Sequence, residues 1–259
     1  MIRDLAISMA IAFALVATRM SAFVAVSPFP GPLVPTKIKI GLVLLLAASV
    51  APIAPPAGVT GPGGAIGPGV VLATLAEAAT GAAIGFVFRI GMSAAEVVGA
   101  TLAHAMGLTF ASSYDPLHGS NDDPLARILT GAATLGAFAV GAHRVVIGAV
   151  IASVRIVPLG SFPDPAALLP GLLTWTSRSI DCGLGLAMPV LTVSLAVQLS
   201  LGLVARAAPS LQIFSVGLAL MFASGFLVFA VGAGDTLAAV VAHLAEVPSV
   251  LERIVLGVR

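Results

Sequence analysis

The sequence predicts an all-α, polytopic membrane protein built from six to seven long hydrophobic helices with kinks. Its 259 residues are 59% hydrophobic and 9% charged, whereas about a quarter of the residues in soluble domains are charged. The mean hydropathy is +1.12. With 12 basic and 11 acidic residues, the near-zero net charge argues against a nucleic-acid-binding domain. The single cysteine excludes a disulfide scaffold.

The helices are predicted from apolar runs, because a helix needs about 20 mostly apolar residues to cross the hydrocarbon core of a bilayer. Clusters of proline, glycine or polar residues separate these runs. The runs span roughly residues 5–26, 40–51, 70–88, 92–110, 128–153, 180–205 and 211–231. The last two, joined by a short turn, are typical of a helical hairpin.

The third and fourth runs are separated only by Arg89, Ile90 and Gly91. They therefore form one long helix, a kinked helix or a tight hairpin. With seven separate spans, the basic residues near the segment ends favour an outside N-terminus and a cytoplasmic C-terminus. If the two runs form one helix, that assignment no longer holds.

A ridge of small residues follows one helical face. Its members recur at every fourth position, and they are Gly91, Ala95, Gly99, Ala103 and Gly107. Positions four apart lie almost above one another on a helix, and such stripes let helix backbones approach closely. We expect this helix-packing ridge to contact another helix, either of the same chain or of another subunit.

Several ionisable residues lie inside apolar runs, and we expect Glu77, Glu96, His104 and His143 to be buried. Such residues are costly in hydrocarbon and often functional. Two interpretations are open: members of a proton relay, or hydrogen-bonded and ion-paired structural anchors. The second is favoured because sequence alone does not show that the groups form a chain.

Motifs of enzymes are not found. The histidines are too far apart to form a metal-ligand pair at helical spacing. The glycine-rich stretch at residues 61–64 lacks the Lys-Ser/Thr of a phosphate-binding loop. We therefore expect a protein that is not an enzyme, with no catalytic residue, no bound metal and no cofactor.

Several stretches resemble, in order, the FliR family of flagellar export-gate proteins, called SctT in virulence secretion systems. Near the start, Arg19 precedes a proline cluster at residues 28–35 and then Lys37–Ile40. Residues 77–86 match the family's E-x3-G-x3-G-F run. Further matches are Met106-Gly107-Leu108, Phe110-Ala111, Asp115-Pro116, Gly141-x-His143, Pro158-Leu159-Gly160 and Ala187-Met188-Pro189.

The most specific match lies in the hairpin turn. Residues 206–217 resemble the family signature R-x-x-P-Q-L-[NS]-I-F-x-x-G, with Arg206, Pro209, Gln212, Phe214 and Gly217 as the hairpin-turn residues. Ser210 stands where the family usually has Gln, and Gln212 where it has Asn or Ser. These departures affect the contacts expected of the turn.

The resemblance implies a non-enzymatic membrane subunit of the type III protein export gate, with a role in flagellum assembly. It implies a FliP-like part over residues 1–175, a FliQ-like helical hairpin over 176–232 and a C-terminal tail over 233–259. The implied partners are FliP-like and FliQ-like gate subunits, FlhB-like and FlhA-like export proteins, membrane lipid and the exported proteins. The implied location is the bacterial inner (cell) membrane, at the flagellar basal body or secretion-system base.

The resemblance also implies a loop that plugs the closed export channel. The matching residues are Gly107, Leu108, Phe110, Ala111, Ser112, Ser113, Tyr114, Asp115 and Pro116. The residue types are compatible with this role, because Phe110 and Tyr114 supply bulk and Gly107 permits a sharp turn. From the residues alone, an ordinary loop between helices is the favoured interpretation. The alternative function is a stand-alone secondary transporter that uses Glu77, Glu96 and His104.

Overall fold

The computed structural model describes residues 2–29, 31, 34–54, 68–108, 124–207 and 213–254. All regular structure in these residues is helical, which confirms the predicted all-α polytopic fold. Within them, five helices are long and apolar enough to cross a membrane, or six if a bent pair counts as one span. The chain divides into two compact units, and α3 and α7 each contribute residues to both.

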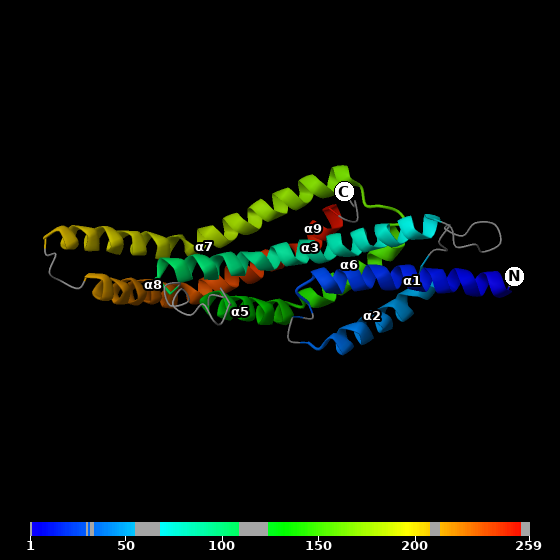
Figure 1. Ribbon diagram of the computed structural model, residues 1–259, viewed down its shortest axis with the longest axis horizontal. Coiled ribbons are helices and arrows are strands. Elements are labelled where there is room, and N and C mark those ends of the chain that lie inside the picture. The colour runs from blue at the N-terminus through cyan, green and yellow to red at the C-terminus, as the bar shows by residue number, and fades with distance from the viewer. Residues whose placement is uncertain are drawn as a thin grey trace. The chain divides into compact units, whose positions relative to one another are not determined.

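The first unit comprises residues 1–91, 141–176 and 246–259. It contains α1 (Ile2–Val26), α2 (Thr36–Val50), a short 3-10 turn (Ala51–Ile53), α6 (Ala142–Ile156) and α9 (Val247–Ile254). It also contains the first parts of α3 (Pro68–Ala105) and α7 (Pro165–Ala207). Helices α1 and α2 lie side by side (Figure 1), and α9 packs on α6.

The second unit comprises residues 92–140 and 177–245. It contains the end of α3, α5 (Pro124–Val140), most of α7 and α8 (Ile213–Leu244). Helix α5 packs along α8 (Figure 1). Its apolar core joins α3 to α7 through Val98, Leu102, Ala105, Met106, Ala187 and Val190.

The third and fourth apolar runs form one helix, α3, which continues without a break through Arg89, Ile90 and Gly91. A single glycine inside a long helix costs only about 1 kcal/mol relative to alanine, and packing offsets that cost. The expectation of an outside N-terminus and a cytoplasmic C-terminus, which required seven separate spans, therefore no longer holds.

The fifth run is divided, because Gly141 separates α5 from α6 with a φ of +80°. This left-handed conformation suits glycine and interrupts a right-handed helix. Helix α2 begins earlier than expected, at Thr36 directly after its N-cap residue Pro35. Lys37 and Lys39 are good helix formers, so the helix extends ahead of the apolar run. Helix α8 continues past residue 232 to Leu244.

Candidate functional site

The most unusual polar feature of the described residues is an ion pair buried in the first unit. Arg19 of α1 and Glu77 of α3 are both fully buried. The Arg19 Nε donates to Glu77 Oε2 at 2.6 Å, and Nη2 donates to Oε1 at 3.0 Å. This side-by-side geometry is the strong, bidentate form of an arginine–carboxylate pair. The two residues are 58 positions apart in sequence, so the pair fixes α1 against α3.

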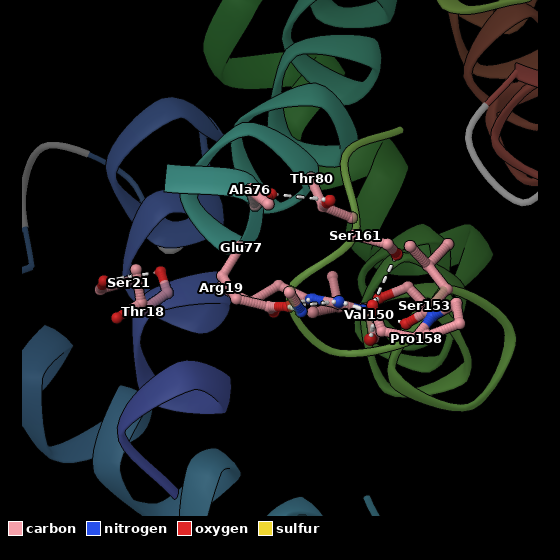
Figure 2. A network of polar contacts seen from close by, with 12 residues as sticks. Thr18, Arg19, Ser21, Ala76, Glu77, Thr80, Val150, Ser153, Pro158 and Ser161 are labelled. Carbon is pink, nitrogen blue, oxygen red and sulfur yellow. Dashed lines mark hydrogen bonds and ion pairs between the residues drawn. The ribbon is translucent and has the colours of Figure 1, made fainter. Parts of the chain in front are cut away.

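Further hydrogen bonds connect this pair to α6 and to the segment that follows it (Figure 2). Arg19 Nη1 donates to Ser153 Oγ at 3.1 Å, and Nη2 donates to the Val157 carbonyl at 3.3 Å. The backbone N–H of Gly160 donates to Glu77 Oε1 at 2.8 Å. We call Arg19, Glu77, Ser153, Val157 and Gly160 the buried clamp.

The buried clamp satisfies the polar atoms of both charges inside an apolar unit. Without such partners, desolvation of a buried charge costs several kcal/mol. Because the Glu77 carboxylate already accepts bonds from Arg19 and Gly160, it is held in one position. The arrangement is suited to fixing helices and a loop together, and less suited to moving protons.

Two glycines allow α1 and α3 to approach closely beside the buried clamp. A Cβ atom added at Gly81 would collide with the Arg19 carbonyl, and one at Gly85 would lie 2.9 Å from the Phe23 carbonyl oxygen. These contacts involve backbone, which cannot move aside as a flexible side chain does. The glycine pair therefore sets the α1–α3 spacing at which Arg19 reaches Glu77.

Trp175 makes a further buried contact in the first unit, which the sequence did not predict. Its side chain is only 2% exposed, and its Nε1 donates to the Val87 carbonyl at 2.9 Å. The N–H of a buried tryptophan usually has such a hydrogen-bond partner. The sequence signal was its isolation, because it is the only tryptophan of the chain.

The structure places the small-residue ridge along α3 and at its end. Gly91, Ala95, Gly99 and Ala103 are buried, as is Gly107 just beyond the helix. At Gly99 the contact is with the backbone of Ala126 on α5. This part of the ridge thus has a helix of the same chain as its neighbour.

The ionisable residues predicted to be buried have different surroundings. Glu77 is buried in the clamp. His143 is half-buried, and its ring stacks on Phe29 with centroids 6.3 Å apart. Glu96 and His104 are exposed on α3, so the expectation of burial is wrong for these two in the single chain. Helix α3 is apolar on most sides, and its hydrophobic pattern did not reveal which side is left open.

The predicted plug begins where α3 ends. Gly107 has a φ of +74°, its N–H donates to the His104 carbonyl at 3.1 Å, and the N–H of Leu108 donates to the Ala103 carbonyl at 2.9 Å. This bond pair is the Schellman ending of a helix. Leu108 packs against the apolar core of the second unit. The other predicted plug residues lie outside the described residues, and they are Phe110, Ala111, Ser112, Ser113, Tyr114, Asp115 and Pro116.

The hairpin-turn residues are described in part. Arg206 is exposed in the last turn of α7, and Gly217 of α8 packs against the Leu201 side chain of α7. Phe214 lies in the first turn of α8. Pro209 and Gln212 fall outside the described residues.

The described part of the chain contains no group of three His, Cys, Asp or Glu side chains that could hold a metal ion. The polar features that the structure brings together in the described residues include the buried clamp, the anchored start of the predicted plug, and a buried hydrogen bond of 2.9 Å between Ser179 of α7 and His243 of α8.

Comparison with known proteins gives consistent matches. Residues 10–247 match the family described as bacterial export proteins, family 1. The flagellar biosynthetic protein FliR of Escherichia coli strain K12 is 30% identical over 192 residues, which cover 74% of this chain and 72% of that protein. FliR of Caulobacter vibrioides is 30% identical over 207 residues, covering 78% and 80%. FliR of Bacillus subtilis strain 168 is 27% identical over 166 residues, covering 62% and 63%.

Proposed function

Because this chain belongs to the FliR family of bacterial export proteins and is thus a component of the flagellar export apparatus, we propose that it is a non-enzymatic export-gate subunit. It helps to form the channel through which flagellar proteins are exported, and its loop after α3 plugs that channel when closed. The observation that carries the proposal is the anchored end of α3 at the start of the matching loop.

The anchored end supports a plug in physical terms. The Schellman ending and the packing of Leu108 against the core fix the point from which the loop departs. A plug must return to one position after each opening, and a fixed base limits the positions that its bulky residues reach. Phe110 and Tyr114 supply that bulk within one short stretch.

The proposed setting is the inner membrane at the flagellar basal body. The proposed partners are FliP-like and FliQ-like gate subunits, with FlhB-like and FlhA-like proteins at the entrance. Residues 1–175 act as the FliP-like part, residues 176–232 as the FliQ-like hairpin and 233–259 as a tail. Open apolar side chains on α7 and α8, such as Leu203 and Val231, support contact with partner subunits or lipid.

A stand-alone transporter finds less support. Its proton relay would use Glu77, Glu96 and His104, but Glu77 is engaged by Arg19 and Gly160. A relay residue must exchange its proton and its partners during transport. The ion pair and the Gly160 N–H instead hold this carboxylate in one position.

The plug is tested by removing its bulk in the assembled gate with Phe110→Gly combined with Tyr114→Gly. Phe162→Gly, at an exposed position of the segment between α6 and α7, serves as the matched control. Ion and small-solute permeability is measured in cells whose gate assembly has been verified. The proposal expects a leak from the double variant alone. Unchanged permeability of that variant, in an assembled gate, would overturn the plug role.

A further inference from the structure

A methionine at the end of α3 fills a notch between α7 and α8 in the second unit. Met106 is only 1% exposed, and it belongs to the apolar core that also contains Val190 of α7. A Cβ atom added at Gly225 of α8 would lie 2.8 Å from the Met106 Cγ and 3.4 Å from the Val190 Cγ1. A side chain at position 225 would therefore occupy the space that Met106 takes. We call Met106, Val190 and Gly225 the methionine seat.

The methionine seat is where the middle of α8 meets the rest of the second unit. Among residues 218–235, all of which the structure describes, Gly225 is the only buried residue. Val228 and Phe229, one turn further along α8, are partly buried against the same core. Glycine is typical of positions where two parts of a chain approach closely. The missing side chain at position 225 thus determines how near α8 comes to the end of α3.

The residue held in the seat is the last one before the chain turns out of α3. Met106 still donates its N–H to the Leu102 carbonyl at 2.9 Å, and Gly107 follows with a φ of +74°. Leu108 then packs against the same core. Methionine suits this position because its unbranched, flexible side chain fills irregular gaps in a core. The point from which the following loop departs is therefore held by α7 and α8 as well as by α3.

We propose that Met106, Val190 and Gly225 are positioning residues of the plug, and that the α7–α8 hairpin holds the base of the plug loop through the methionine seat. Met106 contacts both helices of the hairpin, so a displacement of α8 relative to α7 changes the seat and with it the end of α3. The inference rests on the proposed function, because it names the contacts through which the hairpin acts on the plug.

An exchange of volume across the seat tests this role. Gly225→Val adds three side-chain atoms to the notch, and Met106→Ala removes three from it. Each single change is expected to unseat the end of α3, because overpacking and cavities both disturb a core. The double variant is expected to restore the seat, since volume-conserving changes are tolerated best.

The matched control is Gly136→Val on α5, which adds the same three atoms in the same unit. A Cβ atom at Gly136 would lie 2.5 Å from the Val241 Cγ2 of α8, so this change also presses on a side chain of a neighbouring helix. Val241 lies about 24 Å along α8 from Gly225, at a rise of 1.5 Å per residue. The control therefore strains the unit far from the end of α3.

Hydrogen–deuterium exchange, measured on the assembled gate, reports on the seat directly. The N–H groups of residues 106–108 donate to carbonyls of α3, so they are protected while the end of α3 is held in place. Each single variant is expected to speed their exchange about tenfold or more. The double variant and Gly136→Val should exchange at nearly the rate of the unmodified protein. Unchanged exchange in Gly225→Val, or no recovery in the double variant, overturns the proposal.

Ion permeability of the same gates shows the consequence for the plug, with the Phe110→Gly and Tyr114→Gly double variant as the reference. Both single seat variants are expected to leak, and the volume-exchanged variant and the control should stay closed. Faster exchange at residues 106–108 without a leak, beside a reference that leaks, overturns the positioning role and leaves the plug intact. Absence of a leak from the reference overturns the proposed plug, and the inference with it.

Discussion

The buried clamp yields the most discriminating prediction, which exchanges the two charges with Arg19→Glu and Glu77→Arg. The exchange keeps the Coulomb attraction between α1 and α3. It also places a carboxylate where the Val157 carbonyl now accepts a hydrogen bond, and a guanidinium where the Gly160 N–H now donates one. The polarity of these two backbone groups cannot be exchanged, so we expect the exchanged pair to recover only part of the stability.

The magnitudes give an order for three variants. Glu77→Ala leaves the buried Arg19 guanidinium unpaired, which costs about 3–5 kcal/mol. It also removes the acceptor of the Gly160 N–H, which costs about 1–3 kcal/mol more. The charge exchange leaves two backbone groups without partners, at about 1–3 kcal/mol each. Arg19→Met with Glu77→Met removes both charges, and replacing a buried ion pair by apolar residues is often nearly neutral. We expect the largest loss for Glu77→Ala, an intermediate loss for the exchange and the smallest for the double methionine variant.

Unfolding in mild detergent micelles measures these losses, with Trp175 as an intrinsic reporter. Trp175 lies in the same unit as the clamp, is buried, and donates to the Val87 carbonyl, so its emission changes when that unit opens. Full stability of the charge-exchanged variant, within about 0.5 kcal/mol of the original protein, would refute the reasoning. It would mean that the ion pair acts through charge alone and that the bonds to Val157 and Gly160 are unimportant.

Three further changes test the local packing by the same unfolding measurement. Gly85→Val is expected to lower the free energy of unfolding by about 1–3 kcal/mol, because its Cβ meets the α1 backbone. Its control is Gly41→Val, which should have little effect because nothing lies within 4 Å of that position. Equal effects of the two variants would contradict the close approach of α1 and α3. Gly107→Ala should lower the free energy of unfolding by about 1–2 kcal/mol, because alanine is strained at this positive φ. Its control, Gly148→Ala inside a helix, should be neutral or stabilising. A neutral effect of Gly107→Ala would argue against the Schellman ending. Trp175→Phe should lose about 0.5–1.5 kcal/mol with its buried hydrogen bond, and an unchanged midpoint, read by circular dichroism, would show that this bond is unimportant.

The sequence was sufficient to predict the fold class and most of the apolar helices, because both follow from composition and hydropathy. It was not sufficient to place every helix boundary. The continuity of α3 through Gly91 depends on tertiary packing, which offsets the low helix propensity of glycine. The break at Gly141 depends on a left-handed backbone conformation, and glycine in an apolar run is compatible with either outcome.

The sequence predicted which types of residue matter in the candidate site, but it did not predict which of them pair with one another. Glu77 stood out as an ionisable residue in an apolar run, and Arg19 was singled out by the family resemblance. Their partnership joins residues 58 positions apart, and no local pattern encodes such a distance. Glu96 lies in a similarly apolar run and is exposed. Burial of a single residue in an almost wholly apolar helix depends on where its neighbours pack, which helical periodicity resolves poorly when nearly every position is apolar.

Co-purification of the chain from its native membrane tests the central claim, membership of an export gate, most directly. A tagged chain is extracted in mild detergent, and the proteins bound to it are identified by mass spectrometry. Our account predicts a stable complex that contains FliP-like and FliQ-like subunits, which is absent from a control preparation of an unrelated tagged membrane protein. A monomeric chain that retains its native unfolding transition and carries neither subunit would contradict the account.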